Sequence, residues 1–310
     1  MLEPAVIILR LLQFAGAMVL FGSSLFLLYA LPGTGVGSAC QLSWPRRLLA
    51  LAAGGVLITS VLGLLAHTSI LAGSVAEGLK LESLSAVMTT MSMGPSTAVR
   101  ASASALALLL LAVRRPDGAT WWACAGAGAV ISASFAWMGH GAATNGTAGL
   151  LHLAADILHT LAAGVWIGAL VAFLLLLRPR APSPDMDAVV HKALHGFSGV
   201  GSALVAVLVA SGLVNSWFLV GQGRIAGLWT TPYGQLLSLK LMLFAGMLGL
   251  AAANRFRLTP ALGATLAGDG CSSGEALVAL RRSVVVETAL AFLVLSLVAW
   301  LGTLAPVSAQ

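Results

Sequence analysis

Charged residues are scarce in this chain, and that scarcity sets its class. Only 8% of the 310 residues are Asp, Glu, Lys or Arg, whereas 59% are hydrophobic and the mean hydropathy is +0.98. Because a soluble domain carries about 25% charged residues, the composition excludes a soluble fold. It predicts one integral-membrane domain over residues 1–310, built as an all-α polytopic bundle within the lipid bilayer.

Several chemical motifs are also missing. The three cysteines, Cys40, Cys124 and Cys271, are far apart, odd in number and form no CxxC pair, which argues against a disulfide framework. The sequence shows no nucleotide-binding loop, phosphorylation motif or soluble ATPase domain, and nothing in it indicates an enzyme. The first apolar segment contains Glu3 and Arg10 but no small-residue cleavage site, so we expect a retained membrane span and not a signal peptide.

What the chain does contain is long hydrophobic runs. Eight segments each approach the roughly 20 apolar residues that a helix needs to cross a bilayer. They lie near residues 5–31, 48–71, 97–113, 119–138, 149–177, 193–220, 234–254 and 284–305. We interpret the stretch Leu262–Gly274, between the last two, as a flexible loop.

Basic residues alternate between the loops. Loops one, three, five and seven hold most of the arginines, whereas loops two, four and six hold only Lys80 and Arg224. By the positive-inside rule, the odd loops are cytoplasmic and both termini lie outside. This pattern predicts a multi-pass membrane protein with both termini on the outer side. It also accounts for the net charge of +6, so the charge does not indicate binding to nucleic acid.

The fifth span carries three ionisable residues, His152, Asp156 and His159. At 100° per residue these positions fall within roughly 60° of one another, and Trp166 extends the same stripe. Ionisable groups inside a membrane are costly unless they are paired or face a polar cavity. Imidazole and carboxylate groups together suit Cu, Zn, Fe or haem. The alternative is a polar clamp between helices, with Asp156 orienting one imidazole.

Further metal-binding side chains fall near the same outer surface. They comprise His67 at the end of span two, His140 in loop four and the methionines of the run MTTMSMG in loop two. Thioethers select Cu(I), although methionine is also common packing material. The predicted metal ligands are therefore His67, Met88, Met91, Met93, His140, His152, Asp156 and His159.

Two more ionisable residues lie within spans and need partners. Lys240 lies about two turns into span seven, where it either neutralises Asp156 or extends to the membrane surface. Glu287 lies one to two turns from Arg281 and Arg282, and we favour an internal ion pair there.

Five stretches of the C-terminal half carry a family resemblance. They are LHTLAAGVWIGAL (158–170), GLVNSWF (212–218), TPYGQLLSLK (231–240), NRFRLTP (254–260) and LRRSVVVE (280–287). In their content and order the chain resembles the CopD family of inner-membrane copper-resistance and copper-import proteins, which includes PcoD-like and YebZ-like members. The family-matched positions are His159, Trp166, Tyr233, Gly234, Lys240, Asn254 and Arg255.

The resemblance implies eight spans, copper handling and cooperation with a periplasmic copper-binding protein of the CopC type. It also implies a bacterial inner membrane, so that the termini predicted to lie outside would be periplasmic. No CopC-like domain is fused here, so we expect such a partner to be a separate chain. The family carries over neither a ligand set nor a transport direction.

The sequence therefore predicts a protein that moves copper ions, as Cu(I) or Cu(II), from the periplasm towards the cytoplasm. The membrane potential favours cation import by about 2.3 kcal/mol per charge per 100 mV. One alternative is a haem-binding b-type membrane cytochrome, with His67 and a histidine of span five as axial ligands. The other is a protein that sequesters or delivers copper without transporting it.

Overall fold

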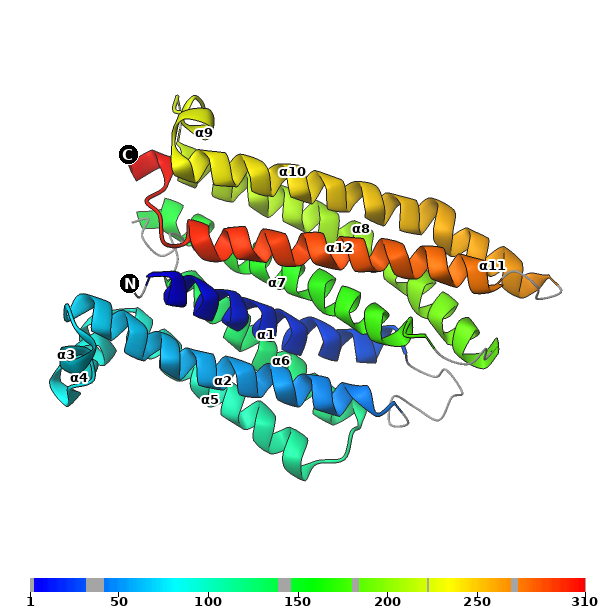
Figure 1. Cartoon of the computed structure of the whole chain (residues 1–310), viewed down its shortest axis with the longest axis horizontal. Helices are drawn as coiled ribbons and strands as arrows, with labels where there is room; N and C mark the ends of the chain where they lie inside the picture. The colour runs from blue at the N-terminus through cyan, green and yellow to red at the C-terminus, as the bar shows by residue number, and fades with distance from the viewer. Residues whose placement is uncertain are drawn as a thin grey trace.

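The computed structural model describes residues 3–31, 42–138, 146–179, 184–221, 223–268 and 273–309. It contains eight helices that are long and apolar enough to cross a membrane, which confirms the predicted spans. They lie side by side along one long axis (Figure 1). The fold is a polytopic helical bundle, as the composition predicted.

The described helices are of two kinds, long ones that form the spans and short ones between or after them. The helices that form the spans are α1 (Glu3–Tyr29), α2 (Trp44–Leu71), α5 (Met93–Val113), α6 (Gly118–Ser134) with η2 (Phe135–Met138), α7 (Gly146–Leu176), α8 (Pro184–Val220), α10 (Pro232–Ala253) and α12 (Ser273–Leu301). The shorter elements are α3 (Val75–Gly78), α4 (Leu81–Thr90), α9 (Gly227–Thr230), η4 (Asn254–Leu258), α11 (Thr259–Ala267) and η5 (Val307–Ala309).

The seventh span continues beyond its expected end. After α10 the chain forms one turn of π-helix, η4, and then the regular helix α11, so the helical span reaches Leu266. The loop expected from Leu262 is therefore wrong over residues 262–267, and Leu262 is fully buried. Pro260 lies in the first turn of α11, where its missing N–H costs least, so it does not end the helical span.

Helix α1 lies at the centre of the bundle and packs against α2, α6, α7 and α12. Its approach to α7 depends on glycine: a Cβ on Gly22 would lie 2.0 Å from the carbonyl oxygen of Gly164. Gly168, one turn further along α7, meets the same backbone, and its carbonyl accepts a 2.9 Å hydrogen bond from Ser23 Oγ. Such small-residue contacts let membrane helices pack closely without a hydrophobic driving force.

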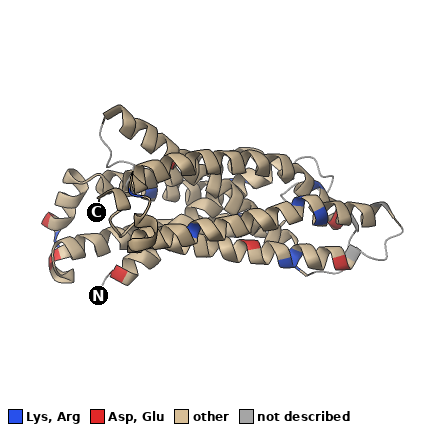
Figure 2. Cartoon of the chain, turned by 90° about the horizontal axis from the view of Figure 1, so that it is seen from above, with Lys and Arg blue, Asp and Glu red and all other residues tan. Residues whose placement is uncertain are grey.

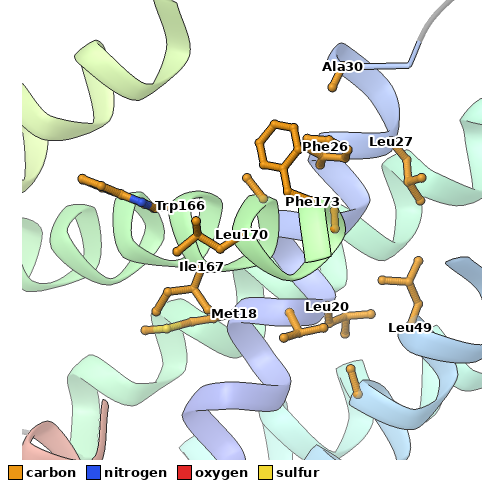
Figure 3. Packing of buried hydrophobic residues seen from close by; sticks show 14 of the residues in the cluster. Met18, Leu20, Phe26, Leu27, Ala30, Leu49, Trp166, Ile167, Leu170 and Phe173 are labelled. Atoms are coloured by element: carbon orange, nitrogen blue, oxygen red, sulfur yellow. The ribbon is translucent and has the colours of Figure 1, made fainter. Parts of the chain in front are cut away.

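One apolar core runs through most of the bundle and includes residues from α1, α2, α5, α6, α7, α8, α10, α11 and α12. Figure 3 shows the part where α1 meets α7, with Phe26 and Phe173 in contact. Their rings pack edge to face with centroids 4.8 Å apart, a geometry that aromatic pairs prefer. Helices from both halves of the chain thus share one packed interior.

Both termini lie at one end of the bundle, together with α3, α4 and α9 (Figure 1). Several basic residues gather at the opposite end (Figure 2). The positive-inside rule predicts that the basic end is cytoplasmic, and we therefore refer to the end with the termini as the predicted outer end.

Candidate functional site

The polar stripe of the fifth span lies on α7 and faces α8. His152 is 2% exposed, and its ring stacks on Phe218 of α8 with centroids 4.6 Å apart and an interplanar angle of 11°. Asp156 and His159 follow on the same face and are half-buried. The stripe therefore lies within the bundle, at the boundary between two helices.

His159 is held in one tautomer by α8. Its Nδ1 lies 3.1 Å from Ser211 Oγ, and the Ser211 hydroxyl donates its own proton to the carbonyl of Val207 at 2.6 Å. Because a hydroxyl has one proton, Ser211 must accept from His159, so Nδ1 carries the hydrogen. This arrangement leaves the lone pair on Nε2, which is the state in which imidazole binds a metal.

Two residues of α10 complete the polar surroundings. Lys240 interacts electrostatically with Asp156 and His159, and the buried Tyr233 interacts with Asp156. Within the described residues, the only ion pair closer than 4.0 Å joins Lys80 to Glu77. Lys240 and Asp156 are thus neighbours whose charges act on each other without direct ion pairing.

A second polar network lies further along α7, around Trp166. The carboxylate of Glu287, 2% exposed on α12, accepts hydrogen bonds from Trp166 Nε1 at 2.8 Å and from Asn254 Nδ2 at 2.9 Å. The ion pair expected between Glu287 and Arg281 or Arg282 is wrong, since both arginines are exposed. Helical neighbours on one face are three or four residues apart, whereas these are five and six residues from Glu287.

His67 belongs to a separate cavity between α1, α2 and α5. The cavity has a volume of about 10 Å³ for the centre of a water-sized sphere, which is room for about one water molecule. Met93 and Met138 are among the side chains that line it. His67 Nδ1 lies 2.9 Å from the carbonyl oxygen of Gly63. A carbonyl only accepts, so His67 also carries its proton on Nδ1 and keeps a lone pair on Nε2.

The predicted methionine loop is partly helical. Met88 lies in α4, Met91 ends that helix, and Met93 begins α5. Met91 is 40% exposed, whereas Met88 and Met93 are half-buried. His140, the remaining predicted ligand, lies outside the described residues.

The described residues bring no three His, Cys, Asp or Glu side chains together as ligands of one metal ion. The spacing on α7 explains this: at 1.5 Å rise per residue, His152 and His159 lie about 10 Å apart along the helix. One ion therefore cannot contact both rings at the distance of roughly 2 Å that metal–imidazole bonds require.

Sequence comparison relates both halves of the chain to known families. Residues 1–150 match the family model described as the N-terminal domain of copper resistance protein D-like proteins, and residues 191–301 match the model of copper resistance protein D. Copper resistance protein D of Pseudomonas syringae pv. tomato is 37% identical over 308 residues, which cover 98% of this chain and 97% of that protein. The chain belongs to the copper resistance protein D family.

Two further relatives of this copper resistance family match shorter regions. Copper transport protein CutJ of Bacillus subtilis is 35% identical over 38% of this chain and 21% of CutJ. Inner membrane protein YebZ of Escherichia coli is 31% identical over 40% of this chain and 41% of YebZ. No solved structure matches the chain.

The residues of the Glu287 network lie within or next to the regions that match the family models. Asn254 and Glu287 fall within the matched region 191–301, and Trp166 lies on α7 between the two matched regions. The sequence showed all three residues in family-like stretches, but it gave no indication that their side chains converge, because Trp166 and Glu287 are 121 residues apart.

Proposed function

We propose that the protein binds copper ions between α7, α8 and α10 and moves them inward from the predicted outer end. Membership of the copper resistance protein D family supports copper as the cargo. The name of the CutJ relative, a copper transport protein, supports movement of the ion and not only its storage. Moving an ion requires no catalytic reaction.

The observation that carries this proposal is the orientation of His159. Ser211 holds its Nδ1 hydrogen, which leaves Nε2 as a ligand within the bundle. Asp156, one turn away on α7, supplies negative charge beside it. A neutral imidazole next to a carboxylate is a donor set that suits either Cu(II) or, with thioethers nearby, Cu(I).

We propose that the stripe works as successive positions and not as a single centre. His152, near the predicted outer end, receives the ion first, and Asp156 and His159 take it about 5 and 10 Å deeper. Sites with few ligands hold an ion weakly enough to release it, as conduction through several sites requires.

Lys240 gives this path a means of control. Its ammonium repels copper from His159, while the Asp156 carboxylate attracts both cations. We propose that an arriving copper ion displaces Lys240 as the electrostatic partner of Asp156. Lys240 would then keep the path closed to cations when copper is absent.

The predicted ligands outside α7 serve delivery in this proposal. Met88, Met91 and Met93, together with His67 and His140, lie at or are expected near the outer end. A periplasmic copper-binding protein of the CopC type would hand copper to them. The name of the YebZ relative supports a location in the bacterial inner membrane.

Copper analysis of the purified full-length protein tests this proposal. After loading with copper, the double variant His152→Ala, His159→Ala should hold substantially less copper than the wild type, and His195→Ala is the matched control. Full copper stoichiometry in the double variant would place the site elsewhere. A visible spectrum of the same sample tests the haem alternative, because a strong Soret band would favour a cytochrome.

A further inference from the structure

Two arginines, one buried and one half-buried, line one cavity near the predicted outer end. Arg10 of α1 and Arg100 of α5 both line the cavity that contains His67. Arg100 is 1% exposed, and its guanidinium lies 4.4 Å from the ring centroid of Phe135. A guanidinium stays protonated in proteins, so this cavity contains two positive charges inside a membrane-spanning bundle.

Arg100 is held in place by neutral acceptors. Its Nη1 donates to Gln13 Oε1 at 2.9 Å and its Nε donates to Ser134 Oγ at 3.1 Å. Its Nη2 donates to the sulfur of Met138. These contacts orient the guanidinium and satisfy part of its hydrogen-bonding capacity, but they contribute no negative charge.

Arg10 is less well satisfied. Its Nη1 donates to the carbonyl of Gly302 at 3.0 Å, whereas its Nε is buried without a hydrogen-bond partner. Leaving a buried charged donor unsatisfied is costly. Arg10 also lines a second cavity, next to the first, together with Gln13 and Met138. An unsatisfied donor of a charged group thus lies at the edge of enclosed space.

No carboxylate balances these charges within the described part of the chain. Nine of the ten acidic residues are described, and none has an oxygen within 4.0 Å of Arg10 or Arg100. The tenth, Asp269, lies outside the described residues. Uncompensated charge inside a membrane protein is expensive and marks a functional site by default.

We propose that the cavity between Arg10 and Arg100 binds one small monovalent anion, chloride in the cell. The guanidiniums supply the charge and the Arg10 Nε supplies a donor. The space suits a single small ion and not an organic ligand. The apolar lining from Val6, Leu9 and Leu64 favours a weakly hydrated halide over sulfate or phosphate.

A bound chloride would also affect copper binding by the predicted ligands in the same cavity. Two guanidiniums beside His67 and Met93 repel a bare cation, and a bound chloride removes one unit of that repulsion. Anion binding would therefore precede or accompany any binding of copper at His67. The anion site itself does not depend on the proposed copper path through α7.

Thermal unfolding of the purified full-length protein tests the site. Sodium chloride or sodium bromide is titrated against sodium gluconate at constant ionic strength, in a neutral detergent. In the wild type we expect Tm to rise with halide and to follow a binding curve, because a ligand of the folded state stabilises it. Arg10→Gln should weaken halide binding about 30-fold or more. Arg46→Gln, at an exposed arginine, should leave it unchanged.

Direct binding of radiolabelled chloride to the wild type makes the test independent of variant folding. Arg10→Lys keeps the charge but removes the Nε donor, and it should bind chloride more weakly. Absence of chloride binding to the delipidated wild type would overturn the proposal. So would binding that survives both Arg10→Gln and Arg100→Gln, or stabilisation by phosphatidylglycerol without any halide effect, which would assign the arginines to lipid phosphate.

Discussion

At the residue scale, the hydrogen bond that orients His159 allows a prediction of how much copper affinity depends on it. Ser211→Ala removes the group that holds Nδ1–H and so frees the ring to rotate or change tautomer. We expect copper affinity to fall about 10–100-fold, the usual effect of losing a group that orients a metal ligand. Isothermal titration of the purified variant measures it. Ser296→Ala is the control, because that hydroxyl donates only to the carbonyl of Phe292 on its own helix. Equal affinities in the two variants would contradict the assignment.

Trp166 and Glu287 provide a second test of single side chains. Trp166→Phe keeps the aromatic packing but takes away the donor to the buried carboxylate. We expect the free energy of unfolding to fall by about 1–3 kcal/mol, because a buried acceptor loses its partner. Chemical denaturation in detergent measures the change. Trp122→Phe alters an indole that is 64% exposed, and a loss as large there would show that the bond to Glu287 is not responsible.

The outer methionines allow a test of oxidation state. Replacing Met88, Met91 and Met93 together by Leu keeps their apolar volume and removes sulfur, which prefers Cu(I). Cellular copper uptake should fall under reducing conditions and stay unchanged under oxidising ones. If uptake is the same as in the wild type under both conditions, these three residues serve packing alone.

The sequence identified ionisable residues that interrupt an apolar span. It did not identify residues whose role depends on which side chains lie next to them in space. His152, Asp156 and His159 are conspicuous because charge and imidazole interrupt an apolar span. The ion pair assigned to Glu287 was wrong because nearness in sequence was taken for nearness in space. Arg10 and Arg100 lie on different helices, and the sequence gives no indication that they share a cavity.

At the scale of elements, the contact between α1 and α7 depends on glycine. Gly22→Ala places a methyl group 2.0 Å from the Gly164 carbonyl oxygen, so the helices must separate. We expect destabilisation of about 1–3 kcal/mol from overpacking, measured as a lower midpoint of thermal unfolding. Gly126→Ala adds the same methyl group to α6, where nothing lies within 4 Å. A stability loss in Gly126→Ala equal to that in Gly22→Ala would point to helix flexibility as the cause.

The eight spans could be predicted because hydrophobic length is a local property of the chain. Their ends were less predictable. The π-helical turn at Asn254–Leu258 carries the seventh span through the NRFRLTP segment, beyond the end predicted near residue 254. The short helices α3 and α4 were taken as a loop because neither is long enough to show a clear period.

At the scale of the whole molecule, the distribution of polar groups bears on direction. The α7 stripe begins near the predicted outer end, and the membrane potential drives cations inward. In proteoliposomes oriented as in the cell, a potential of about 100 mV, inside negative, should allow roughly 50-fold accumulation of monovalent copper. Copper flux measured with and without a potassium diffusion potential tests this. Outward flux alone would refute import, and binding without flux would favour sequestration or delivery.

The central position of α1 has a consequence for how the chain is made. Helix α1 leaves the ribosome before its partners: Ser23 bonds to a carbonyl 145 residues further along, and Arg10 to one 292 residues further along. During synthesis, the glycine face of α1 and the Arg10 side chain must therefore contact lipid or water until these partners are made. The bundle closes only when α12 arrives, so a nascent chain that stops short of α12 leaves Arg10 without the Gly302 carbonyl that the finished protein provides.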